Sequence, residues 1–589
     1  MAGKERNGVF ISYATGDGTA FAEGLRTALT TNKIDVWQDV IKLRGGDNWW
    51  QQIVEAITSV NYVLMVLTPL ALERATVQKE WRLARQEGVR VLPILASPDV
   101  PIERLPRWMQ KIQLYRLGFD PTQLEQAKNW ALFLNDIQTG YEPKRRPFMA
   151  DDRGIFVDRP AEYGELIENL IDRDKTEPKP VTRTLALRGA GGYGKTTLAR
   201  AICHDEQVQE AFDDGILWVT LGESTTIDTV RAQIDSLIAV IGGERFDAPT
   251  LEAAKTRLRE LLEDRDMLMV IDDVWHADHA RPFLEGGNRV ARLITTRMGD
   301  SLPASARKID VNRMTQEEAL ALIAYGMPRT AVTPERAALV RLAEQLGEQP
   351  LLLKLANGIL LNRTEKRGIG GAIEYLSELY DEYGIGLGDR QNQIAAAINA
   401  SIRQLTPDER TFYEKLTIFP EDADIPLATL ARWWAVRPIR AERLCEMLVG
   451  FSLLLQYDET AQTIRLHDVI RKHLVENAAG LPDMHARFLS AYSLNVWAEL
   501  PYDEPYLWDR LAYHLIEAGQ GGVLIKTVLD LRYLARKTIL KGTASVEQDH
   551  AAAARFAEQH DHPQRAALAL LERNYRNMVH ILRRCESMH

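Results

Sequence analysis

The residues with the clearest chemistry form one glycine-rich run, Gly189-Ala-Gly-Gly-Tyr-Gly-Lys-Thr-Thr197. It fits the pattern G-x-x-x-x-G-K-[ST], in which the last two positions are Lys195 and Thr196. In such a loop, backbone N–H groups surround a phosphate, the helix N-terminus adds positive potential, and the lysine neutralises the β- and γ-phosphates. Thr196 would hold Mg²⁺. The run therefore predicts a site for a nucleoside triphosphate or diphosphate whose residues are Gly189, Gly191, Gly192, Gly194, Lys195, Thr196 and Thr197.

Two carboxylates and one arginine follow predicted strands further along the chain. The apolar run 267–271 ends in Asp272 and Asp273, so Asp272 would hold Mg²⁺ and Asp273 would orient an attacking water. Arg297 follows the run 292–296, where a guanidinium can distinguish ATP from ADP by charge-assisted bonding. The alternatives are a strand that ends in a polar turn and an ordinary surface arginine.

A second constellation lies in the first 140 residues. Polar and aromatic side chains follow the first and second predicted strands, and a helix after the third carries a glutamate. In open α/β sheets, ligands bind at the carboxyl ends of the strands, so these side chains should surround one cleft. They are Phe10, Ser12, Tyr13, Trp37, Asp39, Trp49 and Glu80.

These residues must be positioned by several domains, because 589 residues suffice for about four domains.

The net charge of −10 argues against a nucleic acid or an anionic membrane as the main partner. Three cysteines form no disulfide framework, and residues 1–7 lack an apolar signal core, which together favour a cytoplasmic protein. The longest apolar stretch, 62–72, is too short to span a bilayer.

The hydrophobic pattern predicts two α/β domains followed by helices. Strand signals in the first domain, of flavodoxin-like size, fall at 9–13, 34–37, 62–68, 89–95 and 114–117. Those of the second domain fall at 184–188, 216–220, 267–271 and 292–296. Helical periodicity dominates from about residue 312. A small wing hairpin is expected from the runs 451–455 and 463–466, and no fixed-period repeat is visible in the last 110 residues.

The order of motifs resembles the NB-ARC ATPases of the STAND class, as in plant immune receptors and apoptotic protease-activating factors. The matching pieces are the runs 156–160, 189–197, 272–273, 295–297, 347–351 and 466–468. The resemblance implies that Val157 and Arg159 lie on the adenine side of the pocket, that Pro350 forms its helical-domain wall, and that His467 meets the β-phosphate of ADP. Taken alone, His467 is more simply a structural histidine. The resemblance further implies an ADP-bound resting state, slow hydrolysis and a molecular switch rather than a pump.

The first domain resembles a TIR domain through Phe-Ile-Ser-Tyr13, the Asp-Val-Trp37 strand, a Gly-Gly-Asp loop and the Glu80-Trp helix. In catalytic TIR domains the matching glutamate is needed to cleave NAD⁺ at the nicotinamide–ribose bond. The resemblance thus implies Glu80 as the catalytic carboxylate, with Phe10, Trp37 or Trp49 as stacking partners and Ser12, Tyr13 and Asp39 as polar contacts. The alternatives are a solvent-facing glutamate and a purely scaffolding TIR domain. Trp81 is expected in the core, whereas Trp49 and Trp50 are ambiguous.

The expected architecture is an α/β multidomain chain. It comprises a flavodoxin-like TIR domain (6–137), a linker (138–155), a P-loop domain (156–311), a helical domain (312–390), a winged helix (391–478) and a helical region that is a possible sensor or its stem (479–589). The whole resembles a bacterial NLR-like relative of plant TIR-type resistance proteins. An unknown trigger and ATP would drive self-association and NAD⁺ cleavage. Two other classes remain: a scaffold whose assembly the NTPase controls, and a transcription regulator whose winged helix contacts DNA.

Overall fold

The structure is a computed structural model in which most of the chain is described. The described residues are 8–38, 49–110, 112–139, 146–151, 154–171, 184–212, 214–223, 225–242, 246, 248, 250–299, 302–303, 305–384, 390–421, 423–458 and 461–586. They fall into two compact units, the first formed by residues 1–150, 203–217 and 265–268, the second by residues 151–202, 218–264 and 269–589. In these ranges, every helix is too short or too polar to cross a membrane.

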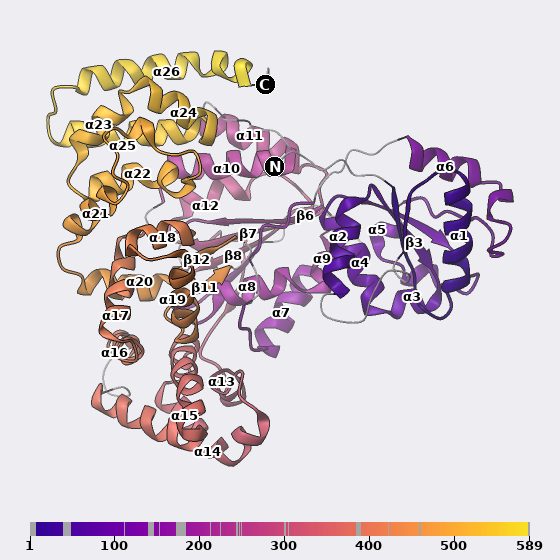
Figure 1. Cartoon of the computed structure of the whole chain (residues 1–589), viewed down its shortest axis with the longest axis horizontal. Helices are drawn as coiled ribbons and strands as arrows, with labels where there is room; N and C mark the ends of the chain where they lie inside the picture. The colour runs from indigo at the N-terminus through magenta and orange to yellow at the C-terminus, as the bar shows by residue number, and fades with distance from the viewer. Residues whose placement is uncertain are drawn as a thin grey trace. The chain divides into compact units, whose positions relative to one another are not determined.

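A four-stranded parallel sheet forms the centre of the N-terminal domain (Figure 1). Its strand order is β2 (Val36–Gln38), β1 (Val9–Ser12), β3 (Tyr62–Leu67) and β4 (Arg90–Leu95). All six residues of β3 are buried because helices cover both faces of the sheet. Side chains of α1 (Thr19–Thr31) and α6 (Trp130–Gln138) pack on one face. Those of α2 (Trp49–Ser59), α4 (Ala75–Gln86) and α5 (Arg107–Gln110) pack on the other, and α3 (Pro69–Glu73) precedes α4.

The second sheet has five strands in the order β6 (Gly215–Thr220), β7 (Met267–Val274), β8 (Ala291–Thr296), β5 (Thr184–Arg188) and β9 (Arg307–Asp310). Strand β5 pairs in parallel with β8 and β9, and α8 (Lys195–Cys203) begins seven residues after it ends. Figure 1 shows the strands between α10 and α12 on one side and α7 and α8 on the other. The helices of this region are α7 (Pro160–Ile171), α9 (Glu206–Ala211), α10 (Ile227–Gly242), α11 (Leu251–Leu262) and α12 (Ala277–Leu284).

Helices and one small antiparallel sheet form the rest of the chain. The helical segment comprises α13 (Gln316–Ile323), α14 (Arg329–Gln345) and α15 (Pro350–Glu382). The next segment comprises α16 (Arg390–Ile402), α17 (Pro407–Glu414), α18 (Leu427–Trp434), α19 (Pro438–Gly450), α20 (Asp468–Asn477) and the strands β10 (Ile425–Pro426), β11 (Gln456–Asp458) and β12 (Thr463–Arg465). The last helices are α21 (Leu481–Ser490), α22 (Pro505–Glu517), α23 (Gly521–Val528), α24 (Leu531–Lys541), α25 (Thr543–Gln559) and α26 (Arg565–Glu586). One hydrophobic core runs through all of these segments, from Met314 to Tyr575.

The predicted fold class, with two parallel α/β sheets before a helical region, is confirmed. Two local predictions are wrong, and one strand was not predicted. Residues 114–117 form no strand, since only Tyr115 makes an isolated bridge to Ile94. The first wing strand begins at Gln456 rather than at Phe451, because residues 451–455 are an apolar turn buried after α19. Strand β9 carries mostly exposed side chains, so its sequence lacks the apolar run used to find the other strands.

Candidate nucleotide-binding site

The phosphate loop connects the end of β5 to the start of α8, as its sequence predicts. Gly192 and Gly194 have φ angles of +78° and +84°, a region that residues with a Cβ rarely adopt. The Lys195 side chain is 6 % exposed, and its Nζ donates a hydrogen bond to the carbonyl of Ala190 at 3.0 Å. The loop therefore already holds its lysine folded over the space where a phosphate would lie.

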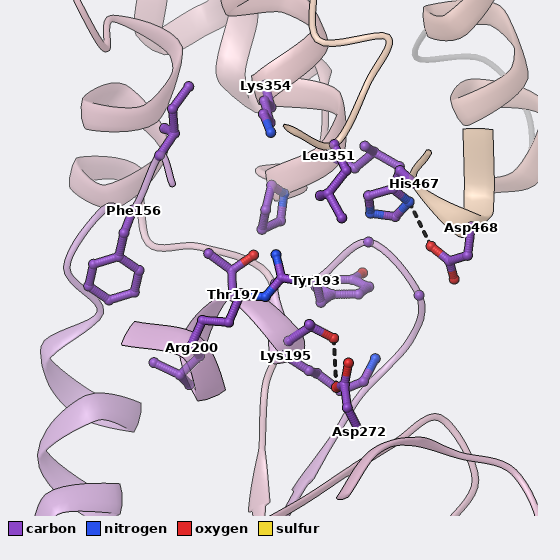
Figure 2. Close-up of a pocket in the computed structure, with 18 of the residues that line it drawn as sticks. Phe156, Tyr193, Lys195, Thr197, Arg200, Asp272, Leu351, Lys354, His467 and Asp468 are labelled. Carbon is purple, nitrogen blue, oxygen red and sulfur yellow. Dashed lines mark hydrogen bonds and ion pairs between the residues drawn. The ribbon is translucent and has the colours of Figure 1, made fainter. Parts of the chain in front are cut away.

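A hydroxyl and a carboxylate that suit Mg²⁺ meet beside this loop. Thr196 Oγ1 donates to Asp272 Oδ1 at 2.9 Å, and Thr295 Oγ1 donates to the same oxygen (Figure 2 draws the first of these bonds). Burial raises the pKa of Asp272, so a cation at this position would favour its charged form. Hydroxyl and carboxylate oxygens are ligands that Mg²⁺ prefers. The donor set fits the predicted metal role of Thr196 and Asp272.

The helical segment contributes a second wall to the pocket. The backbone N–H of Leu351 donates to the carbonyl of Gly192 at 3.2 Å, so the first turn of α15 rests directly on the phosphate loop. Pro350 begins this helix and lines the pocket, as does Lys354 one turn later. Lys354 lies in the same pocket as His467 and Arg200 (Figure 2).

The third wall comes from the segment that joins β12 to α20. Arg297 pairs there with Asp468, and its Nε lies 3.5 Å from Asp273 Oδ1. Asp273 also accepts a hydrogen bond from Trp275 Nε1 at 2.9 Å, and its φ is +50°, which is uncommon for a residue with a Cβ. Arg297 and Asp273, which the sequence predicts beside the nucleotide, therefore both contact protein groups in this structure.

His467 lies between the cations of the pocket and the start of α20. Burial, reinforced by Lys354, Arg297, Lys195 and Arg200, lowers its pKa to about 3. Its Nδ1 lies 2.7 Å from Asp468 Oδ1 and accepts from the backbone N–H of Val469 at 3.2 Å. Because both contacts use Nδ1, Nε2 is the ring nitrogen left for a phosphate, and an anion there would raise the pKa again.

The segment before α7 closes the remaining side. Val157 lines the pocket, and the Arg159 side chain is 3 % exposed. The Arg159 guanidinium donates to the Tyr193 carbonyl at 3.2 Å, to the Asn312 carbonyl at 3.1 Å and to Glu162 at 2.6 Å. Arg159 therefore holds the phosphate loop to neighbouring backbone and stands at the edge of the pocket.

The structure brings nearly all the predicted nucleotide residues into one pocket. Its lining includes Val157, Arg159, Gly191, Gly192, Gly194, Lys195, Thr196, Thr197, Asp272, Asp273, Arg297, Pro350 and His467. Gly189 does not line it, and instead packs closely against the carbonyl of Val311. The charged residues that sequence reasoning missed are Arg200, Lys354, Arg465 and Asp468. Helical spacing could have found Lys354, which lies four residues after Pro350 on the same helix face.

Several of the residues predicted to contact NAD⁺ in the N-terminal domain are more deeply buried than the sequence suggests. Ser12 Oγ donates to Glu80 Oε2 at 2.5 Å, and Glu80 is 3 % exposed. Glu80 is therefore not a solvent-facing helix glutamate, which was one of the alternatives to a catalytic role. Phe10 is fully buried in the hydrophobic core, so its ring offers no face to a ligand. The expected stacking of Phe10 on a ligand is therefore wrong.

The other aromatic and polar residues predicted for this cleft differ in how exposed they are. Trp37 is 37 % exposed, Tyr13 is nearly buried, and Trp81 packs in the core against Trp108 as predicted. Asp39 lies outside the described residues, and the side chains of Trp49 and Trp50 are likewise not described, although both belong to α2.

Comparison with known protein families agrees with this geometry. Residues 9–128 match the TIR domain family, residues 161–331 match the NB-ARC domain family, and residues 481–585 match the APAF-1 helical domain. The chain therefore carries a TIR domain, an NB-ARC domain and an APAF-1-like helical domain, in that order. The last match assigns the C-terminal helices to a known domain family, whereas the sequence analysis described them only as a possible sensor or its stem.

Curated relatives of this TIR–NB-ARC chain come from bacteria, plants and animals. The chain is 30 % identical over 368 residues to the regulatory protein AfsR of Streptomyces coelicolor, covering 62 % of this chain and 36 % of that protein. It is 28 % identical over 254 residues to a probable disease resistance protein of Arabidopsis thaliana, covering 42 % and 29 %. It is 24 % identical over 421 residues to apoptotic protease-activating factor 1 of Homo sapiens, covering 66 % and 32 %.

The chain spans about a third of the length of these curated relatives. Among solved structures, a STAND protein with a tetratricopeptide repeat sensor from Pyrococcus horikoshii matches with a TM-score of 0.41 and 13 % identity, covering 74 % of this chain and 69 % of that one.

Proposed function

We propose that this chain is a nucleotide-controlled immune receptor whose TIR domain cleaves NAD⁺. The observation that carries the proposal is the composition of the pocket walls. The phosphate loop, the first turn of α15 and the β12–α20 segment all line one cavity. A bound nucleotide would therefore contact three segments at once, and its phosphate number would control how they are held together.

In the resting state of this proposal, ADP holds the segments closed. His467 binds the β-phosphate through Nε2, and Arg297 is engaged by Asp468. A γ-phosphate would compete for Arg297, because a guanidinium binds phosphate and carboxylate by the same charge-assisted geometry. Exchange of ADP for ATP would weaken the closed arrangement and favour self-association. Thr196 and Asp272 would hold the Mg²⁺ that accompanies either nucleotide.

The output of the switch would be cleavage of the bond between nicotinamide and ribose. The transition state of this reaction resembles an oxocarbenium ion, which a nearby carboxylate stabilises. Glu80 supplies the carboxylate, and the Ser12 hydroxyl would orient it. Trp37, Asp39, Trp49 and Tyr13 are the remaining candidates for NAD⁺ contacts. Because Glu80 is buried, the TIR domain would have to rearrange before NAD⁺ reached it, and self-association after an unidentified trigger would supply that step.

A pure scaffold is the second candidate, and the burial of Glu80 favours it. The test is NAD⁺ loss by the purified chain over a concentration series, with ADP or ATP and with Glu80→Ala as control. Loss that rises steeply with concentration and vanishes in Glu80→Ala supports the enzyme. Absence of loss from residues 1–140 held at high density on beads, where the full chain still associates with ATP, would support the scaffold.

A further inference from the structure

One lysine of the pocket differs from its neighbours in how its charge is balanced. Six cationic side chains line the cavity, with only three carboxylates among the lining residues. The arginines have carboxylate partners: Arg200 binds Asp151 at 2.9 Å, Arg465 binds the same residue at 2.6 Å, and Arg297 binds Asp468. The remaining lining residues with positive charge are Arg159, Lys195 and Lys354.

Two of these three also have protein partners. Arg159 binds Glu162, and Lys195 donates to the Ala190 carbonyl. In the ranges that the structure describes, Lys354 has no hydrogen-bond or ion-pair partner. Lys354 is half-buried, and a cation in a partly enclosed pocket without a counter-ion favours an anion placed against it.

The surroundings of Lys354 reinforce this preference. It extends from α15 into the pocket that also contains His467 and Arg200 (Figure 2). Burial, and then repulsion from Arg200, lowers the pKa of Lys354 to about 8, and Lys354 in turn helps lower the pKa of His467. An anionic phosphate between these groups would relieve both effects.

We propose that Lys354 is a second phosphate-binding lysine, which grips the diphosphate of ADP from the helical segment while Lys195 grips it from the phosphate loop. The proposal deepens the function proposed above and rests on it. Lys354 would make the closed state specific for an anionic ligand, because its contact ties α15 to the phosphates rather than to the base. It would also couple the position of α15 to the nucleotide, since that helix contacts Gly192 through Leu351.

The test compares ADP binding by the full chain and by Lys354→Met, with Mg²⁺ present. Loss of one charge-assisted contact should weaken ADP binding by about tenfold to a hundredfold at pH 7. Lys354→Arg should restore most of the affinity. The control is Lys366→Met, which removes an exposed lysine from the same helix and should leave binding unchanged. Adenosine, measured by competition, should bind wild type and Lys354→Met equally, because it has no phosphate.

A pH series supplies a readout that a merely structural lysine would not affect. ADP affinity of the wild type should fall as the pH rises from about 8 to about 10, while Lys354→Arg should show less of this fall. The charged or titratable groups that share the pocket are Arg159, Tyr193, Lys195, Arg200, Asp272, Asp273, Arg297, Arg465, His467 and Asp468. They are common to both proteins, so the difference between the two curves isolates Lys354.

The outcomes separate the two proposals. If the wild type binds no ADP, the proposed nucleotide switch fails. If the wild type binds ADP and Lys354→Met binds it equally well at pH 7, the switch stands and the role of Lys354 is overturned. An equal loss of adenosine and ADP affinity would also overturn it, because the lysine would then shape the pocket rather than bind phosphate.

Discussion

Asp272 and Glu80 are both buried carboxylates near the carboxyl end of a parallel sheet, and each accepts a hydrogen bond from a hydroxyl. Asp272 is 4 % exposed and is bound by Thr196, while Glu80 is 3 % exposed and is bound by Ser12. Their surroundings differ. Asp272 borders a pocket lined by six cations, whereas Glu80 accepts its hydrogen bond from Ser12, a residue of its own domain.

The difference shows that the same local pair, a buried carboxylate and a hydroxyl, can lie beside a charged pocket or inside a packed domain. The nucleotide pocket has its charged side chains directed at a shared space, so a ligand needs little rearrangement to bind. Around Glu80 the carboxylate is directed at its own domain. In the proposed function, the nucleotide pocket would be the point of control and the surroundings of Glu80 would rearrange in response.

The largest effect that sharpens this comparison is expected at Lys195. Lys195→Ala should weaken ADP binding more than a hundredfold, because it removes the cation of the phosphate loop. Saturating ADP, at about 100 times its Kd, should stabilise the wild type by about 2.7 kcal/mol and should no longer stabilise this variant. Calorimetric titration and thermal unfolding measure both effects. Glu80→Ala is the control and should bind ADP normally; bound nucleotide that is unchanged in Lys195→Ala would contradict the pocket assignment.

The second effect separates the two carboxylates directly. Asp272→Asn should weaken binding of the Mg²⁺ complex of ADP by about tenfold to a hundredfold. Binding of ADP in EDTA should change much less, since the amide keeps the shape of the side chain. Glu80→Gln should change neither. Titrations with and without Mg²⁺ measure this, and an equal loss under both conditions would show that Asp272 only supports the fold.

The third effect concerns the hydroxyl that binds Glu80. Ser12→Ala removes a partner of a buried carboxylate, so it should lower the free energy of unfolding of the N-terminal domain by about 1–3 kcal/mol. Thr27→Ala, which removes an exposed hydroxyl bonded to the Glu23 carbonyl, is the matched control and should cost about 0.5 kcal/mol or less. Denaturant unfolding measures both. Equal costs would mean that the Ser12–Glu80 bond stabilises nothing.

The smallest effect is a pH dependence of the protein without nucleotide. The folded pKa of His467, about 3, lies below its unfolded value of 6.5. Between those values the unfolded chain binds the extra proton, so stability falls as the pH drops through this window. His485, with a pKa lowered by burial to about 4, contributes in the same direction. His467→Gln should reduce the slope of melting temperature against pH, and ADP should reduce it in the wild type alone. An unchanged slope in His467→Gln would show that the imidazole is not buried uncharged.

Much of the molecule was predictable because it depends on local pattern. The glycine–lysine loop, the buried strands β7 and β8, and the small sheet near Arg465 all carry signals within a few residues. Strand β9 was not predictable, since its side chains are mostly exposed and its pairing with β5 comes from the rest of the sheet.

By itself, the sequence determined the kinds of chemistry and their order along the chain: a glutamate in the first domain, a phosphate loop, one strand with two aspartates, and a histidine before the last helices. Only the tertiary structure decided which groups face one another. It directed Lys354 into the nucleotide pocket, paired Arg297 with Asp468, and buried Glu80 against Ser12. The physical reason is that charge and hydrogen-bonding capacity belong to a residue type, whereas burial and partnership depend on residues hundreds of positions away.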